Sequence, residues 1–158
     1  ISRKGVPATL IAILVLVLIP FMVFLAIHWK QKVKEEQCYY DVMLKMEEKC
    51  ITCRGFLDTG NSLYDPVNGK PVILMNKGML SSLYQEIEIN HPEKIRYIPY
   101  RSVGKENGLL QGIRFDEVII ENGEETYSNS FVTVALSENE FKHKKDFQVL
   151  LHSGLLGQ

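Results

Sequence analysis

An Asp-Thr-Gly triplet occupies residues 58–60, directly after the apolar pair Phe56 and Leu57. The carboxylate of Asp58 can activate a water molecule, and the hydroxyl of Thr59 can hold a loop by hydrogen bonding. Gly60 lets the backbone turn tightly and approach a substrate, because glycine has no Cβ. Since Asp, Gly and Asn are also common turn residues, the triplet alone fits an ordinary turn as well.

The same triplet after an apolar approach is typical of aspartic peptidases, in which two carboxylates share one proton and hold a water molecule. Like charges about 3 Å apart cannot both ionise easily, so one carboxyl acts as a base while the other stays protonated. The sequence holds one such triplet, and the Thr-Gly pair is missing after Asp41, Asp65, Asp116 and Asp146. A peptidase activity therefore predicts a homodimer in which each chain contributes Asp58.

Short apolar segments separated by turn residues make up the chain around the triplet. Strands are predicted at 39–46 and 50–57, as a hairpin that leads to Asp58. A turn at 65–70 and a hairpin turn at Asn122-Gly123 separate later elements. These are strands at 71–75, 95–103, 109–110, 115–121, 131–136 and 147–151, with a bend at Gly112, a helix at 79–86 and a short terminal helix from Leu155. About eight strands with little helix predict a mainly β fold, a closed or partly closed barrel.

Residues 1–31 predict one transmembrane α-helix with its flanks, followed by a linker at 32–38 and one domain at 39–158. No charged residue occurs from Val6 to Ile27, and this length of helix spans about 33 Å, the thickness of the hydrocarbon core of a bilayer. Trp29 suits the membrane interface. A secretory signal peptide is the alternative.

Charge and cysteine content indicate the side of the membrane on which the domain lies. Lys30, Lys32 and Lys34 after the span outnumber the basic residues before it, which favours a cytoplasmic C-terminal side. The three cysteines (Cys38, Cys50 and Cys53) fit a reducing compartment. From residue 32 onward the formal net charge is −4. A mildly acidic domain argues against nucleic acid as a partner.

The stretch from Gly55 to Pro66, Gly-Phe-Leu-Asp-Thr-Gly-Asn-Ser-Leu-Tyr-Asp-Pro, followed by Gly69 to Ile73, resembles the sporulation sigma-E factor-processing peptidase family of endospore-forming bacteria. Further similarity lies at 98–104, 112–118 and 150–152, so the resemblance covers nearly the whole chain. It implies a membrane-embedded aspartic endopeptidase with a retroviral-protease-like β-barrel, active as a homodimer. Its substrate would be the sigma-E precursor, and its activator a signalling protein made in the forespore. The domain would lie at the cell membrane, on the cytoplasmic, mother-cell side.

The resemblance also suggests roles around Asp58. Thr59 is expected to reach the opposite loop of the dimer by a hydrogen bond, Gly60 to free its N–H, and Asn61 to bond within the loop. Two features depart from the family pattern. Family members resemble proteins with several N-terminal spans, so this chain is expected to match their C-terminal part. The hydrophobic-hydrophobic-Gly segment of retroviral-type peptidases has its nearest counterpart in 150–153, with His152 in place of glycine, while Gly112, Gly154 and Gly157 are other candidates.

Other reactive side chains are assigned no chemistry. Cys50 and Cys53 lie three apart on a predicted strand, where they point to opposite faces, and no second pair completes a zinc site. We expect no metal and no cofactor. The histidines at 91, 143 and 152 are taken as structural, and the basic run 142–145 as a solvated loop that could also meet acidic lipid headgroups. Arg101 fits either a substrate contact or a structural one.

Two other functions remain open from the sequence. A non-catalytic, membrane-tethered β-domain acting as a receptor or scaffold would explain the span and the strands without Asp58. Phosphoryl transfer through an aspartyl intermediate would require lysine and acidic motifs for phosphate and magnesium, which the sequence lacks.

Overall fold

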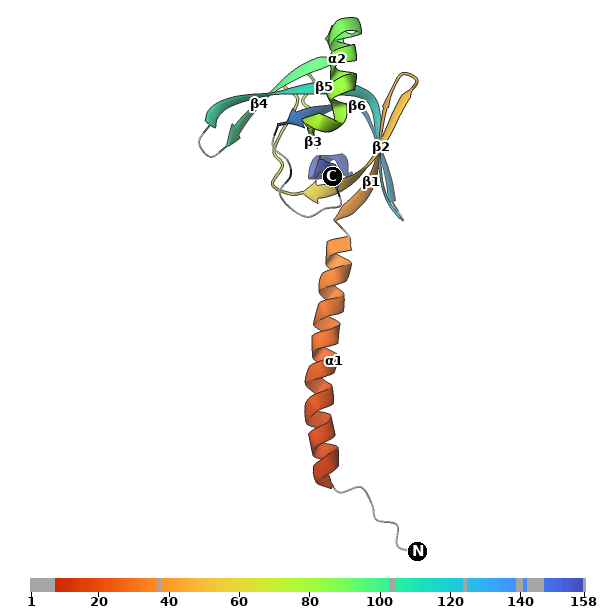
Figure 1. Ribbon diagram of the computed structural model, residues 1–158, viewed down its shortest axis with the longest axis vertical. Helices are drawn as coiled ribbons and strands as arrows, with labels where there is room; N and C mark the ends of the chain where they lie inside the picture. Colours follow the sequence, from red (N-terminus) through yellow and green to blue (C-terminus); the bar gives the residue numbers. More distant parts are fainter. Residues whose placement is uncertain are drawn as a thin grey trace, which may run out of the picture. The chain divides into compact units, whose positions relative to one another are not determined.

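The computed structural model describes residues 8–36, 38–102, 105–123, 125–138, 141 and 147–157, except for the side chains of 8–13, 31–36, 102 and 105–107. The chain divides into two compact units, Ile1–Gln37 and Cys38–Gln158 (Figure 1). The first contains one long helix, and the second contains the strands. The predicted basic loop at 142–145, with His143, lies outside the described residues.

Helix α1 (Ala8–Glu36) contains Pro20 and continues through 32–36, which the sequence predicts to be linker. Lysine and glutamate are good helix formers, so the composition of that segment does not end the helix. The large apolar side chains described between Leu14 and Leu25 are all exposed.

The predicted membrane span, Val6 to Ile27, is not supported by the structure. Among the described residues, no helical stretch combines the length and the apolar character needed to cross a membrane. The predicted span begins in residues whose side chains lie outside that description. It therefore stays a prediction from the sequence.

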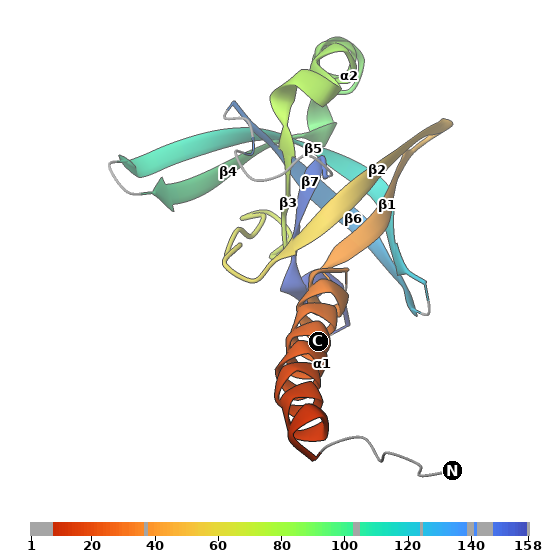
Figure 2. The ribbon, with the colours of Figure 1, turned by 60° about the horizontal axis from the view of Figure 1, so that its bottom comes forward.

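The described part of the second unit contains seven strands in one sheet. They are β1 (Tyr39–Met46), β2 (Lys49–Asp58), β3 (Ile73–Asn76), β4 (Ile95–Ser102), β5 (Lys105–Asn122), β6 (Glu125–Ser137) and β7 (Val149–His152). Their order is β1-β2-β7-β3-β6-β5-β4, and β1 also pairs with β5. This additional pairing closes six strands into a barrel and leaves β4 outside the ring (Figures 1 and 2). The predicted mainly β barrel is confirmed.

Strand β5 is continuous where the sequence predicts two strands with a bend at Gly112. It runs for 18 residues. Gly112 pairs with Ala135 of β6 on one side and with Arg96 of β4 on the other. A Cβ at this position would lie 3.0 Å from the Cγ2 of Thr133 and 3.0 Å from the carbonyl oxygen of Val134. Glycine is therefore required here for close packing of the strands and not for a bend.

The barrel interior is the main hydrophobic core, built from alternate residues of its strands. Leu44, Phe115 and Leu151 are among its fully buried side chains. Helix α2 (Lys77–Asn90), predicted at 79–86, begins after Asn76, whose side chain accepts a hydrogen bond from the N–H of Gly78 at 2.9 Å. One stripe of α2 packs on this core, at helical spacing, through Leu80, Leu83, Tyr84 and Ile87.

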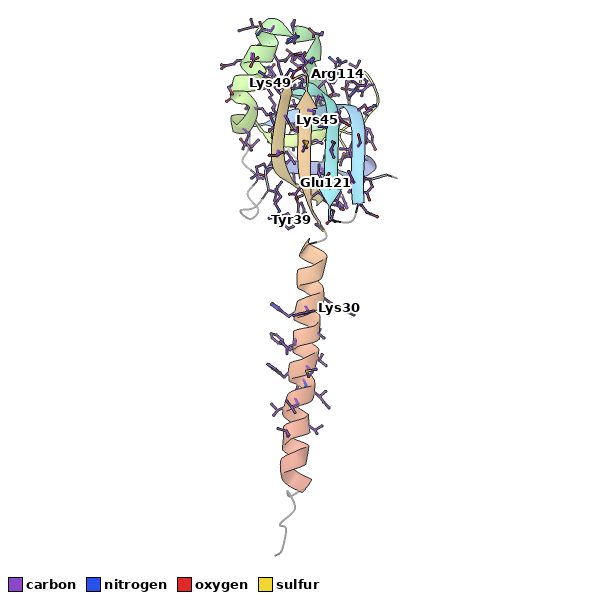
Figure 3. The ribbon with its side chains drawn as sticks, turned by 90° about the vertical axis from the view of Figure 1, so that its right-hand side faces the viewer. Lys30, Tyr39, Lys45, Lys49, Arg114 and Glu121 are labelled. Carbon is purple, nitrogen blue, oxygen red and sulfur yellow. The ribbon has the colours of Figure 1, made fainter. Side chains whose placement is uncertain are left out.

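The outer surface of β1 and β5 carries charged side chains around one apolar pair, Met43 and Ile119. Figure 3 shows Lys45 and Glu121 on it, and Lys45 forms an ion pair with Glu117 at 3.0 Å. Exposed ion pairs of this kind contribute little to stability, about 0–1 kcal/mol. Among the described residues, no further hydrophobic cluster covers this side of the barrel.

A second, smaller layer covers the outer face of β3, β6 and the middle of β5. Its buried centre consists of Val72, Ile98 and Ala135, with Leu63, Leu74 and Leu110 packed around them. The covering segments are the loop after Asp58 and the hairpin formed by β4 and the first half of β5, which extends away from the barrel (Figures 1 and 2). We call this region the outer layer.

Candidate active site

Asp58 is the last residue of β2, and it faces the outer layer. A Cβ on Gly55 would lie 2.8 Å from Val42 and 2.9 Å from Leu151, inside the barrel core. Since side chains alternate along a strand, Asp58, three residues on, points to the opposite face. There it pairs in parallel register with His152 of β7. The barrel thus presents the carboxylate at the end of a strand that neighbours hold on both edges.

Backbone groups of the following turn surround Asp58. The N–H of Gly60 donates to its Oδ1 at 2.9 Å, and the N–H of Asn61 donates to its carbonyl oxygen at 3.1 Å. A Cβ at Gly60 would lie 3.2 Å from Oδ1, so a larger residue would crowd the carboxylate. The turn therefore fixes Oδ1, while no hydrogen bond to Oδ2 comes from the described residues.

Asn61 and Thr59 differ in how they meet the rest of the chain. The Asn61 side chain donates to the carbonyl of Val72 at 2.9 Å and accepts from the N–H of Leu63 at 3.1 Å. It joins the two ends of the loop. Thr59 is exposed, and its hydroxyl has no partner among the described residues. Its predicted contact with a second copy is not tested by one chain.

An open groove of about 970 Å³ lies in front of Asp58. Its described walls come from the Asp58 loop (Gly60 to Leu63), the hairpin (Tyr97, Tyr100, Arg101 and Leu109 to Gln111) and the ends of β3 and β6 (Leu74, Lys77 and Leu136 to Glu138). Lys77 and Glu138 form an ion pair across the groove wall at 3.3 Å. Glu138 is the other carboxylate among these lining residues. The structure also places Arg101, unassigned from the sequence, in this wall.

The segment Leu150-Leu151-His152 lies beside Asp58, whereas Gly112, Gly154 and Gly157 do not pair with β2. His152 is buried, and burial lowers the pKa of its imidazole. Its Nδ1 accepts a hydrogen bond from the N–H of Gly154 at 2.9 Å, which assigns the proton of the neutral ring to Nε2. The ring also meets the Tyr64 ring edge-on, with centroids 4.8 Å apart. His152 therefore packs the loop against β7.

Cysteines and histidines elsewhere form no site in the described part of the chain. Cys53 packs against the barrel core while Cys50 is exposed, on the opposite face of β2. His91 caps the C-terminus of α2 and lies 3.9 Å from Glu47 and 3.5 Å from Glu93. No group of three His, Cys, Asp or Glu side chains that could hold a metal ion occurs among the described residues.

Asp65 is a residue of this region that the sequence does not single out. It is fully buried and accepts a hydrogen bond from the Thr133 hydroxyl at 2.6 Å. The sequence shows only its place in an Asp-Pro turn, where aspartate is common and exposed. The burial of Asp65 follows from the positions of β6 and β4 beside that turn, and the local sequence does not show those positions.

The relatives found by comparison with known proteins agree in their descriptions. The family model described as "Sporulation factor SpoIIGA" matches residues 2–155. The "Sporulation sigma-E factor-processing peptidase" of Priestia megaterium is 28% identical over 133 residues, 73% of this chain and 43% of its own length. That of Bacillus subtilis is 25% identical over 134 residues, again 73% of this chain and 43% of its own. The chain thus spans less than half the length of these curated relatives. No solved structure matches it.

Proposed function

The chain belongs to the sporulation factor SpoIIGA family, and from this membership we propose that it is the catalytic part of an aspartic endopeptidase that processes a sigma-E precursor. The observation that carries the proposal is the position of Asp58. Asp58 ends strand β2, its carboxylate accepts a hydrogen bond from the N–H of Gly60, and the residue lines an open groove of about 970 Å³.

The active site requires a second copy of the chain. In the proposed mechanism one Asp58 removes a proton from a water molecule, whose oxygen attacks the carbonyl carbon of the substrate. The Asp58 of the second copy donates its proton to the carbonyl oxygen, which gives a tetrahedral intermediate. The first Asp58 then passes the proton taken from water to the amide nitrogen as the C–N bond breaks, and the carbonyl re-forms by returning a proton to the second Asp58. A homodimer would bring the two turns together, and Thr59, exposed and adjacent, would bond across them.

The proposed architecture is a retroviral-protease-like barrel. Three features support it: the closed six-stranded ring, the parallel pairing of β2 with a later strand that carries Leu150 and Leu151, and the hairpin beside the groove. Main-chain groups of a hairpin in this position would bind a peptide in extended form. Closure of the hairpin would exclude water from the reacting bond.

The substrate, activator and membrane attachment are proposed from the relatives and the sequence. The names of these relatives specify sigma-E factor processing. A signal from the forespore would activate the enzyme, and the domain would lie on the mother-cell side of the membrane. Exposed apolar side chains along α1 support a lipid or helical partner for that unit. Two domains restricted to one membrane plane would dimerise at a raised effective concentration.

Replacement of Asp58 tests the proposal. Asp58→Asn should lower cleavage of the precursor by about 10³-fold or more, since the base is removed. It should leave the unfolding temperature within a few degrees, because the side chain is not in the core. Glu138→Gln is the control, because it replaces the other carboxylate among the described residues of the groove with an amide of similar size. If Glu138→Gln abolishes cleavage and Asp58→Asn does not, the assignment to Asp58 is wrong.

Mixed dimers test whether the site is shared. Unmodified chain mixed with excess Asp58→Asn chain should lose activity in proportion to the heterodimers formed. A fully active heterodimer would exclude a site made from two copies. Persistent cleavage by Asp58→Asn alone would favour the receptor or scaffold alternative, with another enzyme responsible for the cleavage.

A further inference from the structure

The outer layer contains a buried carboxylate that joins three separate segments. Asp65 has no exposed surface. Its Oδ2 accepts the hydroxyl hydrogen of Thr133 at 2.6 Å, and its Oδ1 accepts the N–H of Val67 at 2.8 Å. The Nε of Arg96 lies 3.7 Å from Oδ2. A buried charge is costly unless it is paired and hydrogen-bonded, so these partners are a condition for placing Asp65 here.

Each partner belongs to a different part of the site. Asp65 lies in the loop that begins at Asp58. Thr133 is on β6, the floor of the outer layer, and Arg96 is on β4, the first arm of the hairpin that lines the groove. The carboxylate therefore lies where the loop, the floor and the hairpin meet.

The loop transmits the position of Asp65 to Asp58. The N–H of Asp65 donates to the carbonyl of Lys70 at 2.9 Å, and the N–H of Val72 donates to the carbonyl of Leu63 at 3.0 Å. Asn61 bridges to Val72 as described above, and Asn61 in turn bonds to Asp58. A displacement of the loop at residue 65 is thus passed through a chain of hydrogen bonds to the turn that holds Asp58.

Arg96 is held on the hairpin side but is incompletely paired. Its Nη1 donates to the carbonyls of Glu93 at 2.7 Å and Ile95 at 2.8 Å, at the start of β4. Its Nε is buried and has no hydrogen-bond partner among the described residues. At 3.7 Å, Asp65 is close to, but beyond, hydrogen-bonding distance. A shift of β4 by less than 1 Å toward the loop would complete a charge-assisted bond.

We propose that Asp65 and Arg96 couple the hairpin to the catalytic turn, so that hairpin closure over the groove and the final placement of Asp58 occur together. Asp65 is then a positioning residue that acts on Asp58 through the loop. Arg96 moves with the hairpin, so its distance from Asp65 depends on the position of the hairpin. The coupling itself rests on the contacts described here. Its consequence for cleavage rests on the proposed function.

A purely structural ion pair gives a different expectation. Loss of a local anchor would loosen the segment that carries it and lower stability. Loss of a coupling would also loosen the other segment: a change in the loop would loosen the hairpin, and a change in the hairpin would loosen the loop. Backbone hydrogen exchange of the full-length chain, without substrate, separates the two cases because it reports local opening segment by segment.

In this experiment, Asp65→Asn should accelerate exchange about tenfold both in 59–72 and in the hairpin segments 95–100 and 108–113. Arg96→Gln should do the same in the same segments. Lys94→Gln is the matched control, since Lys94 is also a buried cation paired with carboxylates, at 2.8 Å from Glu47. It should accelerate exchange near 46–49 and 91–94 and leave 59–72, 95–100 and 108–113 unchanged. If Asp65→Asn affects only 59–72, the coupling is excluded.

Cleavage of the precursor gives the second measurement. Asp65→Asn should lower kcat about tenfold while KM changes less than threefold, because the substrate still binds but Asp58 is misplaced. Arg96→Gln combined with Asp65→Asn should be no worse than the stronger of the two single changes, as expected for residues acting as a pair. Arg96→Lys, which keeps the charge, should recover part of the loss. Fully additive losses in the double variant would overturn the proposal.

The proposed function and the proposed coupling can be rejected independently of each other. If hydrogen exchange shows the coupling but Asp58→Asn still cleaves the precursor, the proposed function is wrong and the coupling stands. If Asp58→Asn is inactive and exchange shows no transfer between loop and hairpin, the proposed function stands and the coupling is wrong.

Discussion

The barrel interior and the outer layer are held together in different ways. The interior is apolar, and its residues come from nearly every strand and from α2. The outer layer has a buried centre of Val72, Ile98 and Ala135, and its covering segments are fixed by polar groups such as Asn61 and Asp65. Apolar packing is non-directional, whereas hydrogen bonds specify positions. The comparison indicates that the barrel supplies stability while the outer layer supplies the geometry of the Asp58 site.

Truncations of one core residue in each region test this division most strongly. Phe115→Ala in the barrel should lower the free energy of unfolding by about 3–5 kcal/mol, and Ile98→Ala in the outer layer by about 2–4 kcal/mol. Urea unfolding of the full chain, followed by circular dichroism, measures both. Activity per folded molecule should fall more for Ile98→Ala, because Ile98 supports the hairpin. If the two variants lose equal activity per folded molecule, the barrel and the outer layer do not differ in how they support the Asp58 site.

Thiol reactivity tests whether water enters the barrel. Burial raises the pKa of Cys53 to about 12. At pH 8 only about one molecule in 10⁴ then carries the reactive thiolate. We expect iodoacetamide to modify the exposed Cys50 about 10³-fold faster than Cys53, as followed by mass spectrometry of the peptides. Similar rates at the two cysteines would mean that β2 separates from the core in the folded protein.

The pH dependence of stability gives the smallest effect, at the polar contact between the β1–β2 turn and the segment after α2. Burial opposes the charge of Lys94, but the hydrogen bond with Glu47 and the charge of Asp116 outweigh it and raise the pKa of Lys94 above 10.5. The hydrogen bond with Lys94 lowers the pKa of Glu47 below 4.5. The Lys94 contribution is therefore complete below pH 10.5 and is lost at higher pH. The Glu47 contribution is complete above pH 4.5 and is lost at lower pH.

Urea midpoints of the unmodified chain and of Lys94→Gln, compared between pH 3 and pH 11, measure this contribution. The difference between the two proteins should be largest from pH 5 to pH 10 and should narrow toward both extremes. A difference that does not vary with pH would show that Lys94 acts through packing and not through its charge.

Local patterns predicted most of the strands and the turns between them. The hairpin of β1 and β2 is found as predicted, and so is the turn at Asn122-Gly123, where Gly123 adopts a positive φ of 56°. Such features depend on neighbouring residues, which a single sequence displays. The predicted helix ends at Glu86, whereas α2 runs to Asn90, because Glu86-Ile87-Glu88-Ile89 alternates with a period of two and so gives a weak helical signal in the sequence.

Pairings between distant residues were not predicted. Nothing near Gly112 in the sequence shows that two strands press on it from both sides, so a bend was predicted in place of a continuous β5. The buried pair of Asp65 and Thr133 joins residues 68 positions apart, and neither has an unusual neighbour. The same holds for the closure of the barrel by β1 and β5. Turn chemistry is local, whereas register and burial are decided by the assembled sheet.

The place of β7 has a consequence for how the protein comes to fold. This strand is made long after β2, yet it inserts between β2 and β3 and pairs with the residues that end at Asp58. Non-local parallel pairing of this kind is slow, because a long loop must be closed before any contact forms. During synthesis on the ribosome, one edge of β2 would therefore remain unpaired until β7 emerges. A nascent or truncated chain could hold much of its secondary structure and still lack an assembled catalytic turn.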